Sequence, residues 1–298
     1  MKYKKKPDWL RMPSRGAEEA ARVRGILRKY SLDTVCRQAK CPNLGYCYQH
    51  GTATFLILGN VCTRSCRYCA IGPAPEIPDP LHHDEPERVA EAAAEMKLSY
   101  VVVTSVTRDD LPDGGAGHFA RTVKALRDRI KGVRIEVLTP DFNGNHAALE
   151  TVAEADPDVF NHNLETVEKL FSEVRPDASY NLSLSTLALY GKMSPSTPLK
   201  SGLMLGLGEQ DNDIRKAIHD LRSSGVTMLT IGQYLQPTRR HWPVDRYVTP
   251  EEFDNWREFA LSEGFNSVAS GPLVRSSFHA ELNYRSEVLT ELCGSVSL

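Results

Sequence analysis

Three cysteines lie close together in the segment CTRSCRYC: Cys62, Cys66 and Cys69. Thiolates are soft ligands that select zinc, copper(I) or iron–sulfur clusters, and short spacings let one loop supply several of them. A structural zinc site normally closes with four protein ligands. Three thiolates on a 4Fe-4S cluster leave one iron open for a molecule that is not protein. The spacing therefore favours a cluster with an exchangeable position, with structural zinc and a lone electron-transfer cluster as the alternatives.

A second group of cysteines precedes the first: Cys36, Cys41 and Cys47 in CRQAKCPNLGYC. Disulfide frameworks belong to small secreted domains, whereas this chain has 298 residues and no apolar segment after its N-terminal lysines of the kind an export signal requires. The second group therefore predicts a second cluster. The seventh cysteine, Cys293, stands alone and is interpreted as a spare thiol.

Charge and composition narrow the classes of partner. Lys plus Arg number 36 and Asp plus Glu 38, which leaves a net charge of −2 and gives no global field for nucleic acid or an acidic membrane. The lysines of MKYKKKPDW predict a solvated tail, with contact to an acidic protein partner as the second option. No run of 18 apolar residues is present. We therefore expect a soluble, cytoplasmic protein that binds neither nucleic acid nor membrane.

Apolar runs alternate with amphipathic segments, which is typical of a parallel sheet with helical crossovers. About six such units fit, so we expect an α/β fold, a partial (β/α)6 TIM-type barrel over residues 51–245. An extension with the second cysteine group precedes it (1–50) and another follows (246–298). The predicted strands are 54–59, 100–106, 133–140, 157–163, 199–208 and 226–235.

Two helix starts are indicated by capping residues. Asp84 with Glu87 predicts a capping box, and Thr249 with Pro250 and Glu252 predicts another helix start.

The first cysteine segment, with Tyr68 before its last cysteine, resembles the signature of the radical S-adenosylmethionine (SAM) superfamily. In that superfamily the amino and carboxylate groups of SAM chelate the open iron. GLMLGLGE, from Gly202 to Glu209, resembles the superfamily's GxIxGxxE segment. This implies that Gly206 and Glu209 lie near the adenine, with a simple tight turn as the alternative.

Polar residues follow two other predicted strands. Asn161, Asn163 and Glu165 in NHNLE stand where the ribose hydroxyls or the methionine carboxylate of SAM could sit, although Asn163 could instead cap a helix. In TSVTRDD, Arg108 could hold a carboxylate, or Asp109 and Asp110 could build a turn.

Both cysteine segments together resemble the lipoyl synthase family, over nearly the whole chain. The other matching segments are KPDWLR, TSVTRDDLPDGGA, NHNLETV, KSGLMLGLGE, IGQYLQPT and GPLVRSSFHA. The resemblance implies that the cluster on the first three cysteines reduces SAM to a 5'-deoxyadenosyl radical. That radical removes hydrogen from carbons six and eight of an octanoyl chain linked to a carrier lysine, and the second cluster donates both sulfur atoms.

The resemblance also assigns residues near the C-terminus. Ser277 corresponds to the family's serine ligand of the second cluster. Arg275 is expected to balance the thiolate charge or to hold Ser277 in place, with an exposed surface arginine as the alternative. His279 could bind metal, or it could be a packed or solvated histidine. Phe278 and Tyr48 stand where the family commonly has tyrosine and tryptophan, and both keep an aromatic ring for packing.

The implied partners are octanoylated lipoyl domains of 2-oxoacid dehydrogenase E2 subunits and the glycine-cleavage H protein. A ferredoxin or flavodoxin would supply electrons, and an iron–sulfur carrier would rebuild the second cluster. Two alternatives stay open: another radical SAM enzyme that inserts sulfur, and a two-cluster electron-transfer protein.

Overall fold

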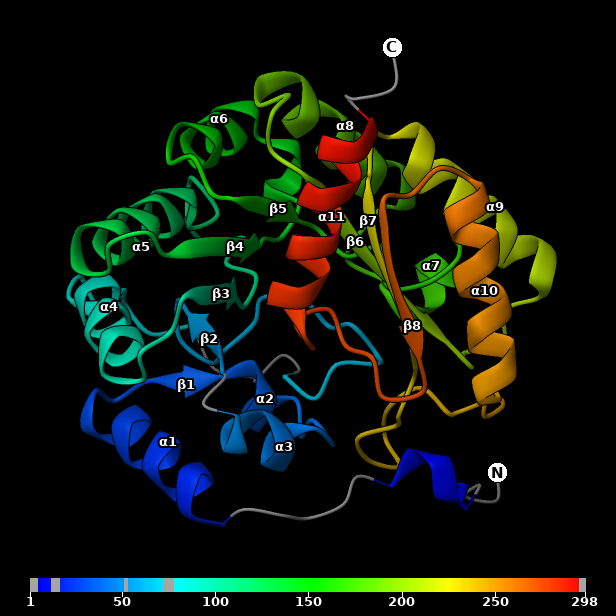
Figure 1. Cartoon of the computed structure of the whole chain (residues 1–298), viewed down its shortest axis with the longest axis horizontal. Coiled ribbons are helices and arrows are strands. Elements are labelled where there is room, and N and C mark those ends of the chain that lie inside the picture. Colours follow the sequence, from blue (N-terminus) through cyan, green and yellow to red (C-terminus); the bar gives the residue numbers. More distant parts are fainter. Residues whose placement is uncertain (1–4, 12–16, 51–52, 72–77, 295–298) are drawn as a thin grey trace.

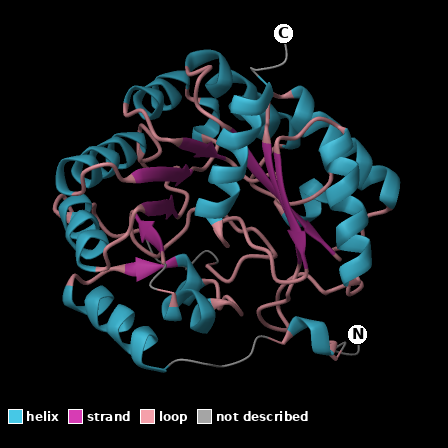
Figure 2. Cartoon of the chain, viewed as in Figure 1, coloured by secondary structure: helices cyan, strands magenta, loops and turns pink. Residues whose placement is uncertain are grey.

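The computed structural model describes residues 5–11, 17–50, 53–71 and 78–294, and in them the strands form one curved sheet with helices around its outer side (Figures 1 and 2). The sheet order follows the chain order from β1 to β8. β1 pairs antiparallel to β2, and each later neighbour pair is parallel. The strands are β1 (Asp33–Thr34), β2 (Thr54–Ile57), β3 (Tyr100–Ser105), β4 (Arg134–Leu138), β5 (Val159–Asn161), β6 (Leu199–Leu205), β7 (Met228–Gln233) and β8 (Ser267–Gly271).

Helices connect the parallel strands and also cover the N-terminal part of the chain. The α-helices are α1 (Ala17–Lys29), α2 (Val35–Gln38), α3 (Leu44–Gln49), α4 (Glu85–Glu95), α5 (Ala116–Arg129), α6 (His146–Glu154), α7 (Glu168–Val174), α8 (Tyr180–Met193), α9 (Asp211–Ser223), α10 (Pro250–Ser262) and α11 (Ala280–Gly294). Two short 3-10 helices are η1 (Asp8–Leu10) and η2 (Phe142–Gly144).

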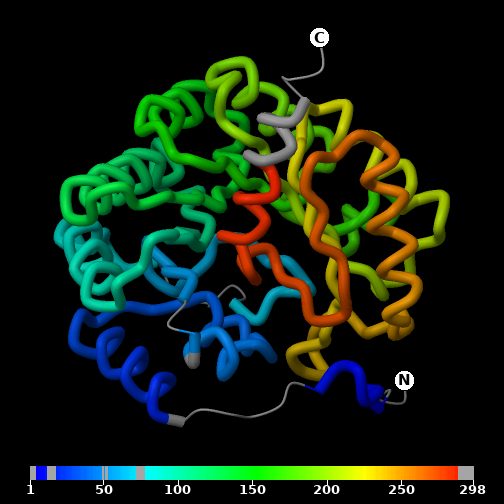
Figure 3. Tube along the Cα trace, viewed as in Figure 1, coloured from blue at the N-terminus to red at the C-terminus, as the bar shows by residue number. Residues whose placement is uncertain are grey.

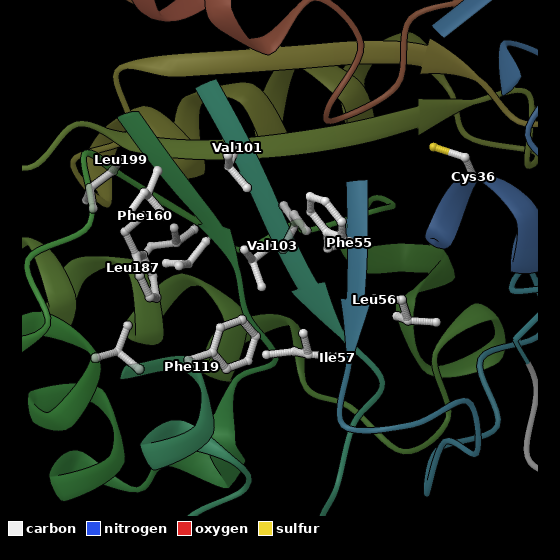
Figure 4. Packing of buried hydrophobic residues seen from close by; sticks show 14 of the residues in the cluster. Cys36, Phe55, Leu56, Ile57, Val101, Val103, Phe119, Phe160, Leu187 and Leu199 are labelled. Carbon is white, nitrogen blue, oxygen red and sulfur yellow. The ribbon is translucent and has the colours of Figure 1, made fainter. Parts of the chain in front are cut away.

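Side chains along β2 show how the sheet separates the core from its concave interior. Phe55 and Ile57 point to the helix-covered side, where they pack near Val103 and Phe119 (Figure 4). Leu56, between them, points to the opposite side, the side on which Cys36 lies in Figure 4. Because successive residues of a strand face opposite ways, an uninterrupted apolar run fits a strand that is buried on both faces.

The predicted helix starts have different outcomes. Thr249 accepts a hydrogen bond from the Glu252 N–H while the Glu252 side chain accepts from the Thr249 N–H, so the capping box of α10 is confirmed. The capping box predicted at Asp84 is wrong. Asp84 precedes α4, but its side chain makes no cap hydrogen bond and instead pairs with Arg88, 3.0 Å away.

The predicted partial barrel is confirmed, and the sheet is longer than expected. β8 adds a parallel strand beside β7 and was not foreseen, because its sequence SVASG contains one large apolar residue. The sheet therefore continues past residue 245, where the sequence suggested a domain boundary. That boundary and the one at residue 50 stay predictions.

The C-terminal helix α11 lies between the two arms of the curved sheet (Figure 1). It contacts β3 through Tyr284, whose ring centroid is 5.8 Å from that of Tyr100. Its Glu287 accepts a hydrogen bond from Asn266, just before β8. The N-terminal segment runs beside the loop that follows β7 (Figure 3). No helix in the described part of the chain is both long and apolar enough to span a membrane.

Candidate functional site

A cavity of about 590 Å³ opens at the carboxyl ends of the parallel strands. In parallel barrels this is the end at which catalytic residues gather. The sequence-predicted residues that line it are Cys36, Cys41, Cys62, Cys66, Cys69, Tyr68, Asn163, Glu165, Arg275 and Ser277. Three predicted residues are not part of the described wall: Cys47, Gly206 and Glu209.

The loop that carries the first cysteine set is held by a buried arginine inside the motif itself. Arg64 is 4% exposed and makes paired hydrogen bonds to the carboxylates of Asp109 and Asp141. Planar arginine–carboxylate pairs of this kind fix geometry as well as charge. Asp109 therefore has a positioning role that neither interpretation of TSVTRDD included.

Burial governs the ionisation of two thiols of the first set, Cys66 and Cys69. It raises the pKa of Cys69 to about 12, and it raises the pKa of Cys66 against the opposing pull of the Arg175 guanidinium. Thiols with raised pKa values stay protonated at neutral pH until a metal displaces the proton. The thiols of the wall are therefore expected to become thiolates only when a metal cation binds them, as the iron ions of an iron–sulfur cluster do.

Arg175 is a functional candidate that sequence reasoning missed. It is 7% exposed, lines the cavity and donates hydrogen bonds to the carbonyls of Asn163 and Leu164. Its cation faces Cys66 and Glu165, and burial raises the pKa of Glu165 in spite of it. Nothing in the local sequence RPDASY signals this position, because α7 carries Arg175 to the cavity from outside the matching segments.

Four residues that line the cavity each have a buried polar atom without a hydrogen-bond partner in the described part of the chain. The atoms are Ser105 Oγ, Thr139 Oγ1, His162 Nε2 and Arg175 Nε. Buried polar groups are normally paired, so these four residues are candidates to bond a water molecule or a polar ligand in the cavity. His162 Nδ1 donates to the Thr139 carbonyl, and burial lowers the pKa of His162 to about 4, so Nε2 is an acceptor at neutral pH.

The second cysteine set lies on α2, α3 and the turn between them. Cys36 and Cys41 reach the cavity wall, while Cys47 lies on α3. None of the six described cysteines forms a disulfide. Burial raises the pKa of Cys36 and of Cys41, and Arg275 opposes the shift at Cys41. Arg275 thus stands where it can balance thiolate charge.

The segment with Ser277 reaches this set from the far end of the chain. Thr54 donates a hydrogen bond of 2.7 Å to Ser277 Oγ, and Asn43 donates one of 2.6 Å to the Leu273 carbonyl. The approach requires a glycine on β7, because a Cβ at Gly232 would overlap the carbonyl oxygen of Val274.

The aromatic departures from the family pattern are both packed. Tyr48 is 2% exposed and its hydroxyl shares a 2.7 Å hydrogen bond with Thr34. The ring centroids of Phe278 and His279 are 4.1 Å apart, with the two rings tilted by 59°, and both rings contact Tyr46. His279 is exposed and makes these ring contacts, which fits the packed or solvated histidine that was the alternative to a metal ligand.

The turn after β6 is built around Glu209. Its carboxylate accepts hydrogen bonds from the N–H groups of Gly206 and Leu207. Gly206 has φ +93°, and a Cβ there would overlap Gln233 and the Arg246 carbonyl. Gly206 and Glu209 therefore stabilise the conformation of the turn beside the cavity. Arg108 likewise turns away from the cavity, to Asp110 and the Leu58 carbonyl.

The donor set fits iron–sulfur chemistry. Five cysteines spread along the wall supply soft ligands, and Arg175 and Arg275 supply cations that favour an anionic cluster. Among the residues that the structure describes, no three side chains of His, Cys, Asp or Glu are grouped as a site for one metal ion. Cys293 lies on α11, and its side chain is outside the described part.

Residues 56–221 match the Radical SAM superfamily. The lipoyl synthase of Syntrophotalea carbinolica is 53% identical over 285 residues, which cover 95% of this chain and 91% of that protein. The lipoyl synthase of Methylococcus capsulatus is 53% identical over 281 residues, 93% of this chain and 86% of that protein. The lipoyl synthase of Chlorobaculum tepidum is 52% identical over 279 residues, 93% of this chain and 95% of that protein.

Solved structures with the same fold are more distant in sequence. Methylornithine synthase (PylB) matches with a TM-score of 0.57 at 14% identity, covering 92% of each chain. HydG, a maturase of the FeFe-hydrogenase, matches with a TM-score of 0.55 at 13% identity, covering 91% of this chain and 78% of that one. At these identities the likeness shows the fold alone.

Proposed function

The chain belongs to the lipoyl synthase family within the radical SAM superfamily, and on that premise we propose that both cysteine sets act together in the cavity described above. The activity is radical SAM-dependent insertion of sulfur into an octanoyl group carried by a protein lysine. The observation that supports the shared site best is that five cysteines of the two sets, together with Ser277, line one cavity.

The first set is proposed to hold the 4Fe-4S cluster that binds SAM, through Cys62, Cys66 and Cys69. The second is proposed to hold an auxiliary cluster through Cys36, Cys41, Cys47 and Ser277. When bound, the two groups supply an electron that splits SAM to a 5'-deoxyadenosyl radical and the two sulfur atoms that the product receives.

Several wall residues are proposed to orient SAM beside the first set. Glu165 and Asn163 offer acceptors and donors for its amino and carboxylate groups, and Tyr68 packs next to Cys69. Arg175 offers a cation for the carboxylate, since its Nε has no hydrogen-bond partner among the residues that the structure describes. Gly206 and Glu209 act indirectly, by fixing the turn after β6.

Ser277 is proposed as the ligand that detaches when sulfur leaves. Thr54 donates a hydrogen bond to Ser277 Oγ, and a bond of this kind stabilises the negative charge that a serine oxygen carries as a metal ligand. A hard oxygen on a soft iron is an ill-matched ligand and should release readily. A Ser277→Cys variant that donates sulfur as fast as the parent would overturn this step.

The cavity also offers apolar wall for an acyl chain. Leu56, Val106, Leu138, Leu203 and Leu235 line it together with the cysteines. Apolar lining with a few placed polar groups is typical of small-molecule sites. The apolar wall would exclude water from the 5'-deoxyadenosyl radical. The radical would then have no reactive neighbour other than the octanoyl carbon.

The carrier partners are proposed to be octanoylated lipoyl domains of 2-oxoacid dehydrogenase E2 subunits and the glycine-cleavage H protein. The electron donor is proposed to be a ferredoxin or flavodoxin, and an iron–sulfur carrier to rebuild the auxiliary cluster. The cytoplasmic location stays a prediction, as does the lack of binding to nucleic acid or membrane.

The test combines metal analysis with mass spectrometry. After anaerobic reconstitution the parent should hold about eight irons per chain, as two cubane clusters require, and should add two sulfur atoms to an octanoyl-lysyl peptide with SAM and reductant. Cys41→Ala should keep SAM cleavage and lose sulfur insertion, while Cys66→Ala should lose both.

The outcomes separate the alternatives. Four irons with SAM cleavage and no sulfur addition would leave another radical SAM enzyme. Eight irons with no SAM cleavage would leave a two-cluster electron-transfer protein. Loss of SAM cleavage in Cys41→Ala would contradict the division of work between the two cysteine sets.

A further inference from the structure

Ser276, the neighbour of Ser277, lies at the centre of a hydrogen-bond chain that crosses the cavity wall. Its hydroxyl accepts a 2.8 Å hydrogen bond from Asn161 Nδ2 and donates one of 3.0 Å to Asn163 Oδ1. Ser276 therefore joins the C-terminal segment to the end of β5. Neither the sequence pattern nor the proposed reaction gives this residue a role.

One end of the chain is anchored deep in the barrel. Asn161 uses its second amide hydrogen for a 2.8 Å bond to Glu136 Oε1. Lys200 Nζ lies 2.9 Å from both oxygens of Glu136, and Tyr100 donates to Oε2 at 2.8 Å. Asn161, Glu136 and Lys200 are all 0% exposed. Because the buried Glu136 carboxylate accepts hydrogen bonds from all of these donors, it fixes the orientation of the Asn161 amide.

The other end reaches the first cysteine set. Asn163 Nδ2 donates to Glu165 Oε1 at 3.2 Å, and the nearby Tyr68 hydroxyl opposes the rise in the pKa of Glu165 that burial causes. Tyr68 directly precedes Cys69. The backbone of Glu165 is held by β6, since its N–H donates to the Gly202 carbonyl and its carbonyl accepts from Met204. The side chain, in contrast, takes its orientation from the hydrogen bond with Asn163.

The direction of each hydrogen bond defines what position 276 must supply. Asn161 presents a donor and Asn163 presents an acceptor, so one atom between them has to accept and donate at once. A hydroxyl does both, whereas alanine does neither. Alanine at 276 would leave one N–H of Asn161 and Oδ1 of Asn163 without partners. Room for Asn163 is limited further, because a Cβ at Gly202 would lie 2.8 Å from its Oδ1.

We propose that Ser276 is a positioning residue that holds the Ser277 segment against the barrel and sets the orientation of Asn163 and Glu165 toward SAM. The segment with the second-cluster serine and the wall that faces SAM then share one hydrogen bond network. This inference rests on the proposed function only for the identity of the two bound groups, SAM and the second cluster. The network itself stands on the contacts above.

The experiment compares Ser276→Ala, Ser276→Thr and Ser270→Ala with the parent, all anaerobically reconstituted. Threonine keeps the hydroxyl. Ser270 is a matched control at the end of β8, because its hydroxyl donates to the Phe253 carbonyl, outside the network and the cavity. Two properties are measured: the Kd for SAM, and amide hydrogen exchange of residues 272–279.

Ser276→Ala should weaken SAM binding about tenfold, the loss expected when buried polar groups lose a partner. It should also speed exchange in 272–279, while Ser276→Thr stays near the parent and Ser270→Ala matches it. If the alanine variant does not fold, Ser276→Cys, which is close in size and donates weakly, should show the same weakening.

Parent-like values for Ser276→Ala in both measurements would overturn the proposal, and so would a threonine variant as impaired as the alanine one. Sulfur transfer by the parent to an octanoyl-lysyl peptide is followed separately. If the parent transfers none but Ser276→Ala still weakens SAM binding, the proposed function fails and the positioning role stands.

Discussion

The buried ion pair of Lys200 and Glu136 offers a quantitative test of how the barrel interior is held. Both side chains are 0% exposed, and Lys200 Nζ lies 2.9 Å from each carboxylate oxygen. In Lys200→Met the carboxylate loses its only cationic partner among the contacts described for it. Removing one member of a buried pair costs about 3–5 kcal/mol. Because Tyr100 and Asn161 still donate to Glu136, we expect the lower end, about 3 kcal/mol.

The assay is urea unfolding of the metal-free protein, followed by circular dichroism. Lys200→Met combined with Glu136→Gln should lose less stability than Lys200→Met alone, because no buried charge is left uncompensated. Lys124→Met is the control, since its pair with Asp128 lies on the surface and both side chains are more than half exposed. It should leave the midpoint unchanged.

The reasoning would be refuted by a Lys200→Met variant that loses less than about 1 kcal/mol, well below the range for buried pairs. A double variant whose loss equals the sum of the two single losses would refute it as well. Either result would mean that the neutral donors Tyr100 and Asn161 alone satisfy the carboxylate.

Three further predictions follow from the cavity and its frame. His162 has a pKa of about 4 in the folded chain against 6.5 ordinarily, so the unfolded chain binds more protons between these values and stability falls as the pH drops. Between pH 7 and pH 4, His162→Asn should lose about 3 kcal/mol less unfolding free energy than the parent, as measured by urea unfolding at each pH. Equal slopes of unfolding free energy against pH in the two proteins would contradict this prediction. Arg175→Met should raise the pKa of Cys66 further and slow its alkylation by iodoacetamide in metal-free protein, read by peptide mass spectrometry; unchanged or faster labelling would count against the role of the cation. Gly206→Ala should destabilise by more than about 1 kcal/mol because of its positive φ and the overlap with Gln233, whereas Gly25→Ala in α1, with open space around it, should stabilise by about 0.5–1 kcal/mol; the reverse order in urea unfolding would be inconsistent with the structure.

Much of the fold was predictable because its strands are long apolar runs. The runs that contain β3, β4, β6 and β7 carry several β-branched or large apolar residues each, which identifies buried strands whatever their neighbours. β8 lacks that signal. It is a strand because β7 offers it a paired edge and α10 covers it, and such tertiary context is invisible in a short stretch of small residues.

The site was predictable to the extent that its ligands come in fixed spacings. Ten of the residues named from the sequence line one cavity. The supporting residues were not predictable, because their partners are distant in the chain. Arg64, which lies between Cys62 and Cys66, was not recognised as a supporting residue, because the carboxylates that it binds are 45 and 77 residues away in the chain. The motif placed Glu209 near the adenine of SAM, yet its carboxylate accepts hydrogen bonds from the backbone N–H groups of Gly206 and Leu207.

The contact between Thr54 and Ser277 also has a consequence for how the protein is made. The two residues are 223 positions apart, and Asn43 and Leu273 are separated by 230. A nascent chain that has emerged from the ribosome as far as β7 already carries both cysteine sets but none of residues 272–279. Its thiols stand beside an incomplete wall until residues 272–279 have been synthesised. Loading of the second cysteine set is therefore expected to wait until this segment has folded against Asn43 and Thr54.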